Sequence, residues 1–157
     1  MLVYRITHKD FSRKLYASGA QGRWNGEGKK VIYSAESIPL AFLENMIRRQ
    51  GVGFNNDFKI MIIDIPGNLK FASISTADLE AGWRDFKNYS KCQPSGDIWY
   101  DEGKTLILKV PSAVLPVAFN YVINTTHPDF KKIQLIGTTD LAPDQRIEEL
   151  LKQYSGK

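Results

Sequence analysis

Two short apolar runs, each stopped by a proline, restrict the fold of this chain more than any other feature. Residues 59–65 and 105–110 are apolar, contain β-branched side chains, and end at Pro66 and Pro111. Runs of this length are typical of buried strands, and proline ends them because it has no N–H to donate to a sheet. Weaker patterns predict further strands at residues 2–6, 31–33, 120–124 and 133–136.

Helix signals are fewer than strand signals. Ser37 is suited to an N-cap and Gly51 stops the following run, so we expect a helix over residues 38–50. Other patterns predict an amphipathic helix over 144–154, a short helix from 75 to 83 and a helical turn at 96–101. Because strands outnumber helices and do not alternate with them regularly, the sequence favours an α+β domain over a doubly wound sheet.

The size and composition fit one globular domain spanning residues 1–157. The apolar runs are far shorter than the roughly 20 residues of a membrane span, and the first residues lack the apolar core of a secretory signal. The single cysteine, Cys92, cannot form an internal disulfide, so we expect a reducing cytoplasm. The net charge of +4 comes from scattered lysines and arginines, so we expect no direct nucleic-acid binding and no membrane association.

Several kinds of catalytic site have no support in the sequence. The chain has two histidines, His8 and His127, and one cysteine, too few for a structural zinc site, and we expect no metal. Residues 22–30 resemble a phosphate-binding loop, but the glycine spacing is wrong and Lys30 stands where Ser or Thr would hold magnesium. The remaining chemistry belongs to carboxylate, arginine, tyrosine and serine side chains.

Glu44 stands out on the predicted helix over residues 38–50. It lies four residues after Leu40 and three before Ile47, so it shares their apolar face. A carboxylate on a buried face is unfavourable unless it is paired or lines a cleft. Glu44 is therefore a candidate functional residue; alternatively, it lies at the edge of the stripe, where it reaches water or pairs with an arginine.

Arg23 lies in a glycine-rich loop, beside Trp24 and Asn25. Glycines let a backbone approach a ligand closely, and an arginine there can form paired hydrogen bonds to a phosphate or carboxylate. Alternatively, Arg23 stacks on Trp24 or ties down its own loop.

Tyr33 and Ser112 each stand at the end of a predicted strand. Tyr33 could stack on a flat ring of a ligand, or it could be a core aromatic with an exposed hydroxyl. Ser112 follows Pro111 and could donate a hydrogen bond to a ligand, or it could belong to an ordinary turn.

Taken together, these segments resemble the RES family, the toxins of bacterial toxin–antitoxin pairs. The Arg, Glu and Ser for which the family is named fall on Arg23, Glu44 and Ser112. Two departures are a missing proline between Asn124 and His127 and a reduced terminal motif at 144–147. The matching segments follow the family order: residues 4–6, 22–25, 31–37, 40–44, 96–99, 110–114, 120–124 and 127–130.

The resemblance implies a fold similar to that of diphtheria-toxin-type ADP-ribosyltransferases, with a split β core and surrounding helices. It implies cleavage of the nicotinamide–ribose bond of NAD, by hydrolysis or phosphorolysis, with NAD as the substrate and no cofactor. Partners would be an Xre-type helix-turn-helix antitoxin and a second copy of the toxin.

The resemblance also assigns roles to residues. Glu44 would stabilise the developing ribose cation, and Arg23, the second catalytic residue, would hold the pyrophosphate. Tyr33 would stack on the nicotinamide or its ribose, Ser112 would bond to the nucleotide, and Trp24 and Asn25 would complete the NAD-binding loop. Two alternatives remain open: an ADP-ribosyltransferase that modifies a protein from the same cleft, and a binding module that has kept the fold without catalysis.

Overall fold

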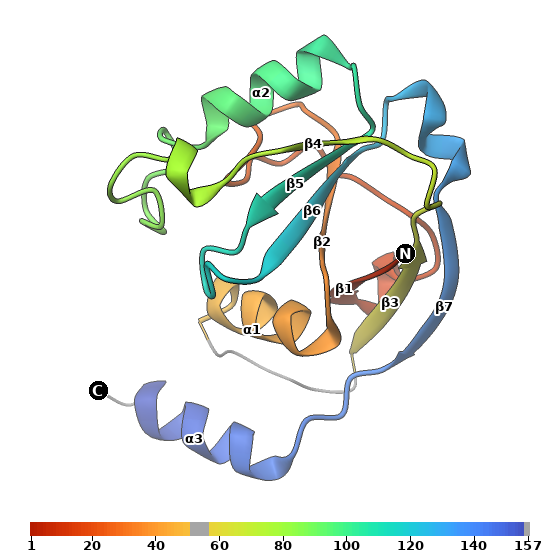
Figure 1. Ribbon diagram of the computed structural model, residues 1–157. Coiled ribbons are helices and arrows are strands. Elements are labelled where there is room, and N and C mark those ends of the chain that lie inside the picture. The colour runs from red at the N-terminus through yellow and green to blue at the C-terminus, as the bar shows by residue number, and fades with distance from the viewer. Residues whose placement is uncertain (51–56, 156–157) are drawn as a thin grey trace.

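The computed structural model describes residues 1–50 and 57–155 of the chain (Figure 1). Within these residues, seven strands form one sheet in the order β4-β5-β6-β2-β1-β3-β7. Only β4 and β5 run parallel; the other neighbours are antiparallel. The strands are β1 (Leu2–His8), β2 (Val31–Ala35), β3 (Phe58–Asp64), β4 (Phe71–Ser73), β5 (Ile107–Pro111), β6 (Phe119–Asn124) and β7 (Gln134–Asp140).

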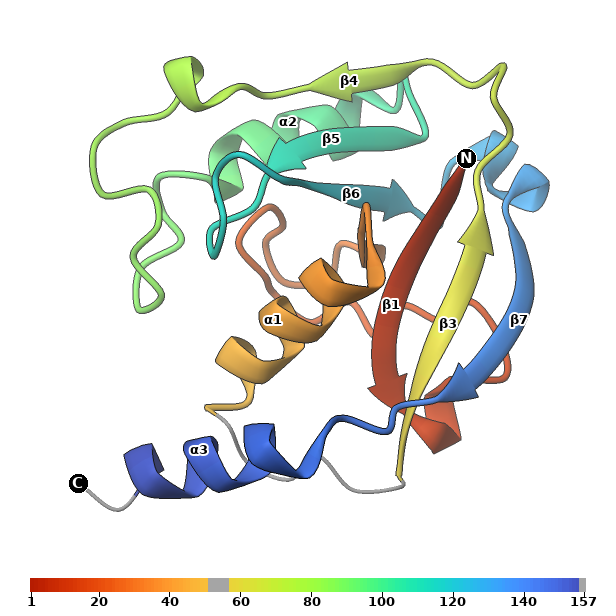
Figure 2. The same ribbon diagram turned by 60° about the horizontal axis from the view of Figure 1, so that its bottom comes forward.

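The sheet opens along a seam between β1 and β2. These two strands pair at one position, Tyr4 opposite Ala35, whereas β1 pairs with β3 along its whole length. Figure 2 shows the consequence: β1, β3 and β7 form one half, turned away from the half that contains β5 and β6. Among the helices, α1 (Ile38–Arg48) contacts both strands at the seam.

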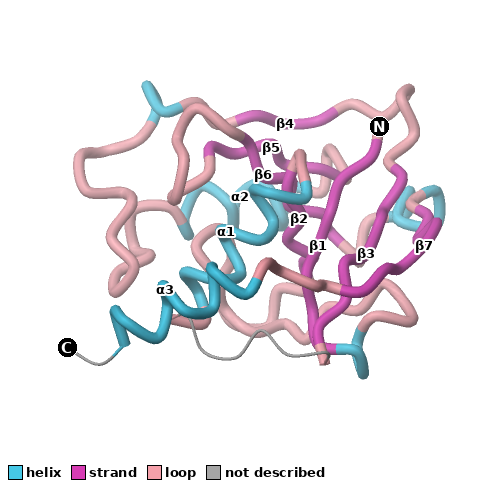
Figure 3. Tube along the Cα trace, turned by 90° about the horizontal axis from the view of Figure 1, so that it is seen from below, coloured by secondary structure: helices cyan, strands magenta, loops and turns pink. Residues whose placement is uncertain are grey.

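The apolar core lies on both faces of the sheet. One face buries Ile32, Ile63 and Ile123 beneath the loops. The other face carries two clusters, one that contains Trp99 of α2 (Gln93–Glu102) and one that contains Leu40 of α1. Leu151 of α3 (Gln145–Ser155) packs at the edge of the α1 cluster, and the rest of α3 leads away from the sheet (Figure 3). No helix within the described residues is long and apolar enough to cross a bilayer.

The predicted α+β class and the main predicted elements are confirmed. All six predicted strands form, with ends that differ from the predicted ones by a few residues. The Ser37 hydroxyl caps α1 by accepting a hydrogen bond from the Leu40 N–H at 3.3 Å. The described helix ends at Arg48, and the predicted stop at Gly51 lies outside the described residues.

Two helix predictions are wrong in extent, and one strand was not predicted. The helix expected from 75 to 83 is a short 3-10 turn, Thr76–Asp78, because the Asp78 carboxylate accepts bonds from both the N–H and the hydroxyl of Ser75 and Leu79 is already extended. The turn expected at 96–101 is part of the longer helix α2. Gly103, which follows the last helical residue, caps the helix with a left-handed φ of 56°. Strand β4 is a three-residue edge strand that carries no period-two pattern.

Candidate functional site

Glu44 reaches from α1 to the end of the sheet, where two side chains hold it. The predicted apolar stripe around it is only partly buried: Leu40 is 3 % exposed, but Ile47 is 55 % exposed. Glu44 therefore lies at the edge of the buried face of α1. Its Oε1 atom accepts a hydrogen bond from the Ser112 hydroxyl at 2.6 Å and another from the Asn120 side-chain amide at 2.6 Å.

Ser112 is fully buried in the turn that follows β5. Its hydroxyl oxygen accepts hydrogen bonds from the backbone N–H groups of Val114 at 3.1 Å and Leu115 at 2.9 Å. Its only hydroxyl hydrogen goes to Glu44. In this structure the serine therefore joins the turn to the carboxylate. A direct hydrogen bond from Ser112 to a nucleotide would need that same hydrogen.

Asn120, which the sequence places only within the predicted strand over residues 120–124, is a direct partner of Glu44. It lies on β6 opposite Ala35 of β2 and Val110 of β5, so it shares a face of the sheet with these residues. Both donors bind the same oxygen of Glu44, and no bond to Oε2 is formed by any residue in the described ranges. The carboxylate is therefore held in place through Oε1, while Oε2 has no hydrogen-bond partner among the described residues.

A second group of predicted residues meets at the glycine-rich loop. The Tyr33 hydroxyl donates to Asn25 Oδ1 at 2.7 Å and accepts from the Trp24 N–H at 2.9 Å. The Asn25 side-chain amide, fully buried, donates to the carbonyls of Ala20, Gly26 and Lys29. Burial raises the pKa of Tyr33 well above its usual value, against the opposing effect of nearby Arg48 and Arg23. Tyr33 is therefore a neutral hydrogen-bonding group.

Helix α2 fixes the position of this loop. The Asp97 carboxylate accepts from the Gly26 N–H at 2.8 Å, and the Gln93 amide donates to the Gly22 carbonyl at 2.9 Å. A Cβ on Gly96 would lie 1.9 Å from the carbonyl oxygen of Trp24, so only glycine allows the helix to approach so closely. Residues 93–97 of α2 therefore hold the glycine-rich loop in place.

Arg23 points to a third segment, residues 83–85. Its guanidinium donates to the carbonyls of Trp83, Arg84 and Asp85 and lies 5.0 Å from the centre of the Tyr89 ring. It therefore ties down a distant loop and not its own, and it stacks on Tyr89 and not on Trp24. These carbonyl bonds engage both Nη1 and Nη2 of Arg23. The buried Cys92 thiol interacts with the same guanidinium, which opposes the rise that burial gives to the pKa of that thiol.

Arg48 adds positive charge near Tyr33, and the charge of Arg48 also acts on a further arginine, Arg5. Burial, and to a smaller degree the charge of Arg48, lower the pKa of Arg5 to about 10. Arg5 donates to the Tyr16 carbonyl at 3.1 Å, and among the described residues neither arginine has a carboxylate within ion-pair distance. Sequence analysis missed Arg48; its only sequence signal is its place one helical turn after Glu44.

The structure thus forms two groups from the predicted residues. Glu44 and Ser112 are in contact, Trp24, Asn25 and Tyr33 are in contact, and Arg23 belongs to neither hydrogen-bonded group. Tyr33 and Ala35 lie on the same face of β2, and Asn120 lies opposite Ala35, so the two groups share one face of the sheet. The catalytic and NAD-binding roles of these residues remain predictions.

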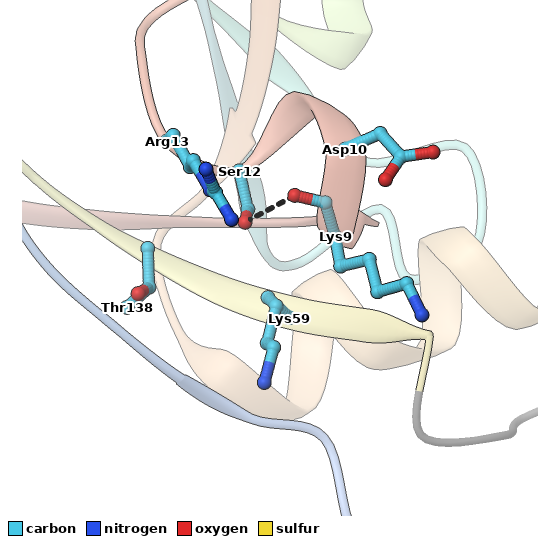
Figure 4. Close-up of a pocket in the computed structure, with 6 residues that line it drawn as sticks. All are labelled: Lys9, Asp10, Ser12, Arg13, Lys59 and Thr138. Atoms are coloured by element: carbon cyan, nitrogen blue, oxygen red, sulfur yellow. Dashed lines mark hydrogen bonds between the residues drawn. The ribbon is translucent and has the colours of Figure 1, made fainter.

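An open pocket at the other half of the sheet contains none of these residues. Figure 4 shows its lining: Lys9, Asp10, Ser12, Arg13, Lys59 and Thr138. Its two lysines are paired, Lys9 with Asp57 at 2.7 Å and Lys59 with Asp140. In residues 1–50 and 57–155, no group of three or more His, Cys, Asp or Glu side chains is arranged to hold a metal ion.

Known proteins resemble this chain in both sequence and fold. A toxin named Res from Photorhabdus laumondii is 29% identical over 97% of this chain and 100% of its own length. A Prs ADP-ribosylating toxin from Sphingobium is 34% identical over 72% of this chain and 71% of its own. The fold is similar to a chain in the crystal structure of the M. tuberculosis MbcT–MbcA toxin–antitoxin complex, with a TM-score of 0.70 and 20% identity over 99% of this chain and 89% of that one.

The description of the matching family agrees with these relatives. The family model of the RES domain matches residues 2–146, which include every residue of the site described above. The chain therefore belongs to the RES domain family and is related to toxins of that family.

Proposed function

We propose that this protein is the toxin of a toxin–antitoxin pair and that it arrests growth by cleaving the nicotinamide–ribose bond of NAD. The observation that carries the proposal is the Glu44 carboxylate, which two donors hold through Oε1 while Oε2 is left without a partner among the described residues. A fixed carboxylate with one free oxygen is suited to meet positive charge that develops on a substrate.

The chemistry follows from this arrangement. Departure of nicotinamide leaves positive charge on the ribose, in an oxocarbenium-like transition state. A carboxylate beside that ribose stabilises the cation more than the neutral ground state, which is the condition for catalysis. Ser112 and Asn120 hold the carboxylate in a fixed orientation. A charge that is already oriented needs no reorganisation during the reaction. The nicotinamide ring already carries positive charge and leaves as a neutral group, so the step requires no general acid.

Arginine side chains would bind the anionic part of NAD. Neither Arg5 nor Arg48 has a carboxylate within ion-pair distance among the described residues, and burial first and the charge of Arg48 second lower the pKa of Arg5. A bound diphosphate would favour the charged form of both arginines. Arg23 would contribute the positive charge of its guanidinium, which the carbonyls of residues 83–85 hold in place. Tyr33, a neutral phenol, would stack on the nicotinamide or its ribose.

The fold and the partners belong to the same proposal. The seam between β1 and β2, crossed by α1, is suited to the split sheet of a diphtheria-toxin-type ADP-ribosyltransferase. The similar chain from M. tuberculosis was crystallised in a toxin–antitoxin complex, which favours an antitoxin as the partner of this chain. We expect that antitoxin to be of the Xre type, the toxin to form homodimers, and NAD to be consumed in the cytoplasm.

A second candidate function is ADP-ribosylation of a protein. The relative from Sphingobium is named as a Prs ADP-ribosylating toxin, and it is 34% identical to this chain. The first chemical step is the same in both functions, since each breaks the nicotinamide–ribose bond. They differ in the acceptor, which is water or phosphate in the first and a protein side chain in the second.

Incubation of the purified protein with NAD tests the proposal. We expect release of free nicotinamide, and loss of cellular NAD during growth arrest when the protein is expressed without a partner. Mass spectrometry of the products and of added bacterial proteins separates the two functions, because only the second adds ADP-ribose mass to a protein. Growth arrest with unchanged NAD and no protein adduct would contradict both.

A further inference from the structure

Arg84 connects the segment held by Arg23 to the turn that carries Ser112. Its guanidinium donates from Nε to the Ala113 carbonyl at 2.7 Å and from Nη2 to the Val114 carbonyl at 3.2 Å. The carbonyl of Arg84 itself accepts a hydrogen bond from Arg23. Arginine-to-carbonyl bonds therefore run from the glycine-rich loop, through residues 83–85, to the turn over residues 112–118.

That turn has little apolar anchoring of its own. Val117 is 89 % exposed and Leu115 is 43 % exposed, so its larger side chains lie largely outside the core. Within the turn, Ser112 and Ala118 are joined by a backbone bond of 2.9 Å, and the Ser112 hydroxyl accepts from the next N–H groups. The long loop before α2 lies beside this turn (Figure 2), and Arg84 supplies bonds between them.

We propose that Arg84 is a positioning residue for Glu44: it fixes the turn over residues 112–118 and thereby sets the place of the Ser112 hydroxyl that holds the carboxylate. This proposal rests on the function proposed above, in which Glu44 stabilises the ribose cation. Arg84 itself touches neither Glu44 nor the reacting atoms. It acts through the backbone of Ala113 and Val114, whose neighbouring N–H groups are bonded to Ser112.

The bond geometry explains why the residue is an arginine. Two nitrogen atoms of one planar group bind two successive carbonyls, and this fixes the direction of the turn as well as its distance. A lysine keeps the charge, but its compact ammonium group lacks that fork. The consequence for catalysis is geometric, because a displacement of about 1 Å at a reacting centre can lower a rate by about 100-fold.

Amide hydrogen exchange tests the link without relying on activity. The variants are Arg84→Ala, Arg84→Lys and, as a control, Arg13→Ala, which removes an exposed arginine that lines the pocket at the other half of the sheet. We expect the N–H groups of Val114 and Leu115 to exchange about 10-fold faster in Arg84→Ala, with a smaller increase in Arg84→Lys and none in the control. Unchanged exchange at these two amides in Arg84→Ala would overturn the proposal.

Steady-state kinetics then test whether the link reaches Glu44. In Arg84→Ala we expect kcat for nicotinamide release to fall about 10-fold while KM for NAD changes less than about 2-fold. In a Ser112→Ala background the same change should lower kcat less than about 2-fold, because Arg84 then has no hydroxyl to position. A full and additive loss in that background, or an unchanged kcat despite faster exchange, would overturn the proposal.

Failure of the proposed function would be recognised separately. If the wild-type protein releases no nicotinamide, the NAD hypothesis fails at that measurement. The amide exchange of Val114 and Leu115 still decides whether Arg84 fixes the turn.

Discussion

The Ser112 hydroxyl and the Glu44 carboxylate are 2.6 Å apart, although 68 residues separate them in the chain. The serine belongs to the turn after β5, and the glutamate to the middle of α1. Asn120 binds the same carboxylate oxygen from β6. One oxygen of Glu44 therefore joins a helix, a turn and a strand, and the second oxygen is the group that the proposed reaction needs.

Glu44→Gln should leave the fold intact and remove most of the activity. The amide oxygen of glutamine can still accept from Ser112 and Asn120, but the negative charge is lost. We expect nicotinamide release to slow by about 100-fold or more, since one electrostatic partner of the transition state is removed. NAD affinity should change little, because the ground-state ribose carries no positive charge, and the melting temperature should change little, because the amide oxygen keeps both hydrogen bonds.

The matched control for this variant is Glu102→Gln, which removes a carboxylate paired with Lys104 at the end of α2. Melting temperature and nicotinamide release are measured on the same samples. A Glu44→Gln protein that is folded, binds NAD and turns over at the wild-type rate would remove Glu44 from the catalytic role.

Asn120→Asp should be more harmful than Asn120→Ala. The alanine variant loses one of the two donors to Glu44 Oε1, and we expect about a 10-fold loss of kcat. The aspartate variant places a second carboxylate beside the first. Two carboxylates at that distance share a proton or repel each other, so Glu44 loses its charge or its position. Kinetics of both variants at pH 7 test this order, and equal activity in the two variants would contradict it.

Tyr33→Phe should lower the free energy of unfolding at neutral pH. It should also make that free energy fall less steeply as the pH rises. The phenol donates to Asn25 and accepts from the Trp24 N–H, so its removal should reduce the free energy of unfolding by about 1–3 kcal/mol. Burial raises the pKa of Tyr33, so the fold favours the neutral phenol.

The sign of the pH effect follows from that direction. A raised pKa in the folded state gives stability that is complete below the ordinary tyrosine pKa of about 10 and is lost as the pH rises toward the folded value. Urea denaturation of the wild type and Tyr33→Phe between pH 8 and about 11 measures this. The difference between them should shrink above about pH 10; a difference that grows there would contradict the assignment.

Arg23→Lys should weaken both NAD binding and the loop at residues 83–85. Lysine keeps the charge, but its single nitrogen lacks the planar fork with which Nη1 and Nη2 of Arg23 bind the three carbonyls. We expect a lower NAD affinity, a lower melting temperature and faster amide exchange around Asp85. Lower stability with wild-type affinity for NAD would assign Arg23 a structural role alone, as the tie between the glycine-rich loop and residues 83–85.

The sequence predicts the strands well because each depends on a local signal. Residues 59–65 and 105–110 combine β-branched side chains with a stop at proline, and the capping serine of α1 is equally local. Strand β4 and the exact extent of α2 lack such signals. Helix α2 contains Gly96, a poor helix former, which is present because the helix must approach the Trp24 carbonyl.

The candidate site is harder to predict because its contacts depend on strand register. The sequence singles out Glu44 and Ser112 as separate residues, and only the pairing of β6 with β2 and β5 brings Asn120 to the same carboxylate. Arg84 carries no sequence signal that separates it from an ordinary surface arginine, and the only signal of Arg48 is its place one helical turn after Glu44. Their neighbours come from segments far apart in the chain, which local patterns do not identify.

The long separation between Glu44 and its partners has a consequence for synthesis of the protein. Ribosomes make the chain from the N-terminus, so α1 is complete long before Ser112 and Asn120 exist, 68 and 76 residues later. A nascent chain that ends before Ser112 has the glutamate but neither of the groups that hold it. The ordered carboxylate therefore forms late in translation, and an unfinished chain lacks the geometry on which its proposed toxicity depends.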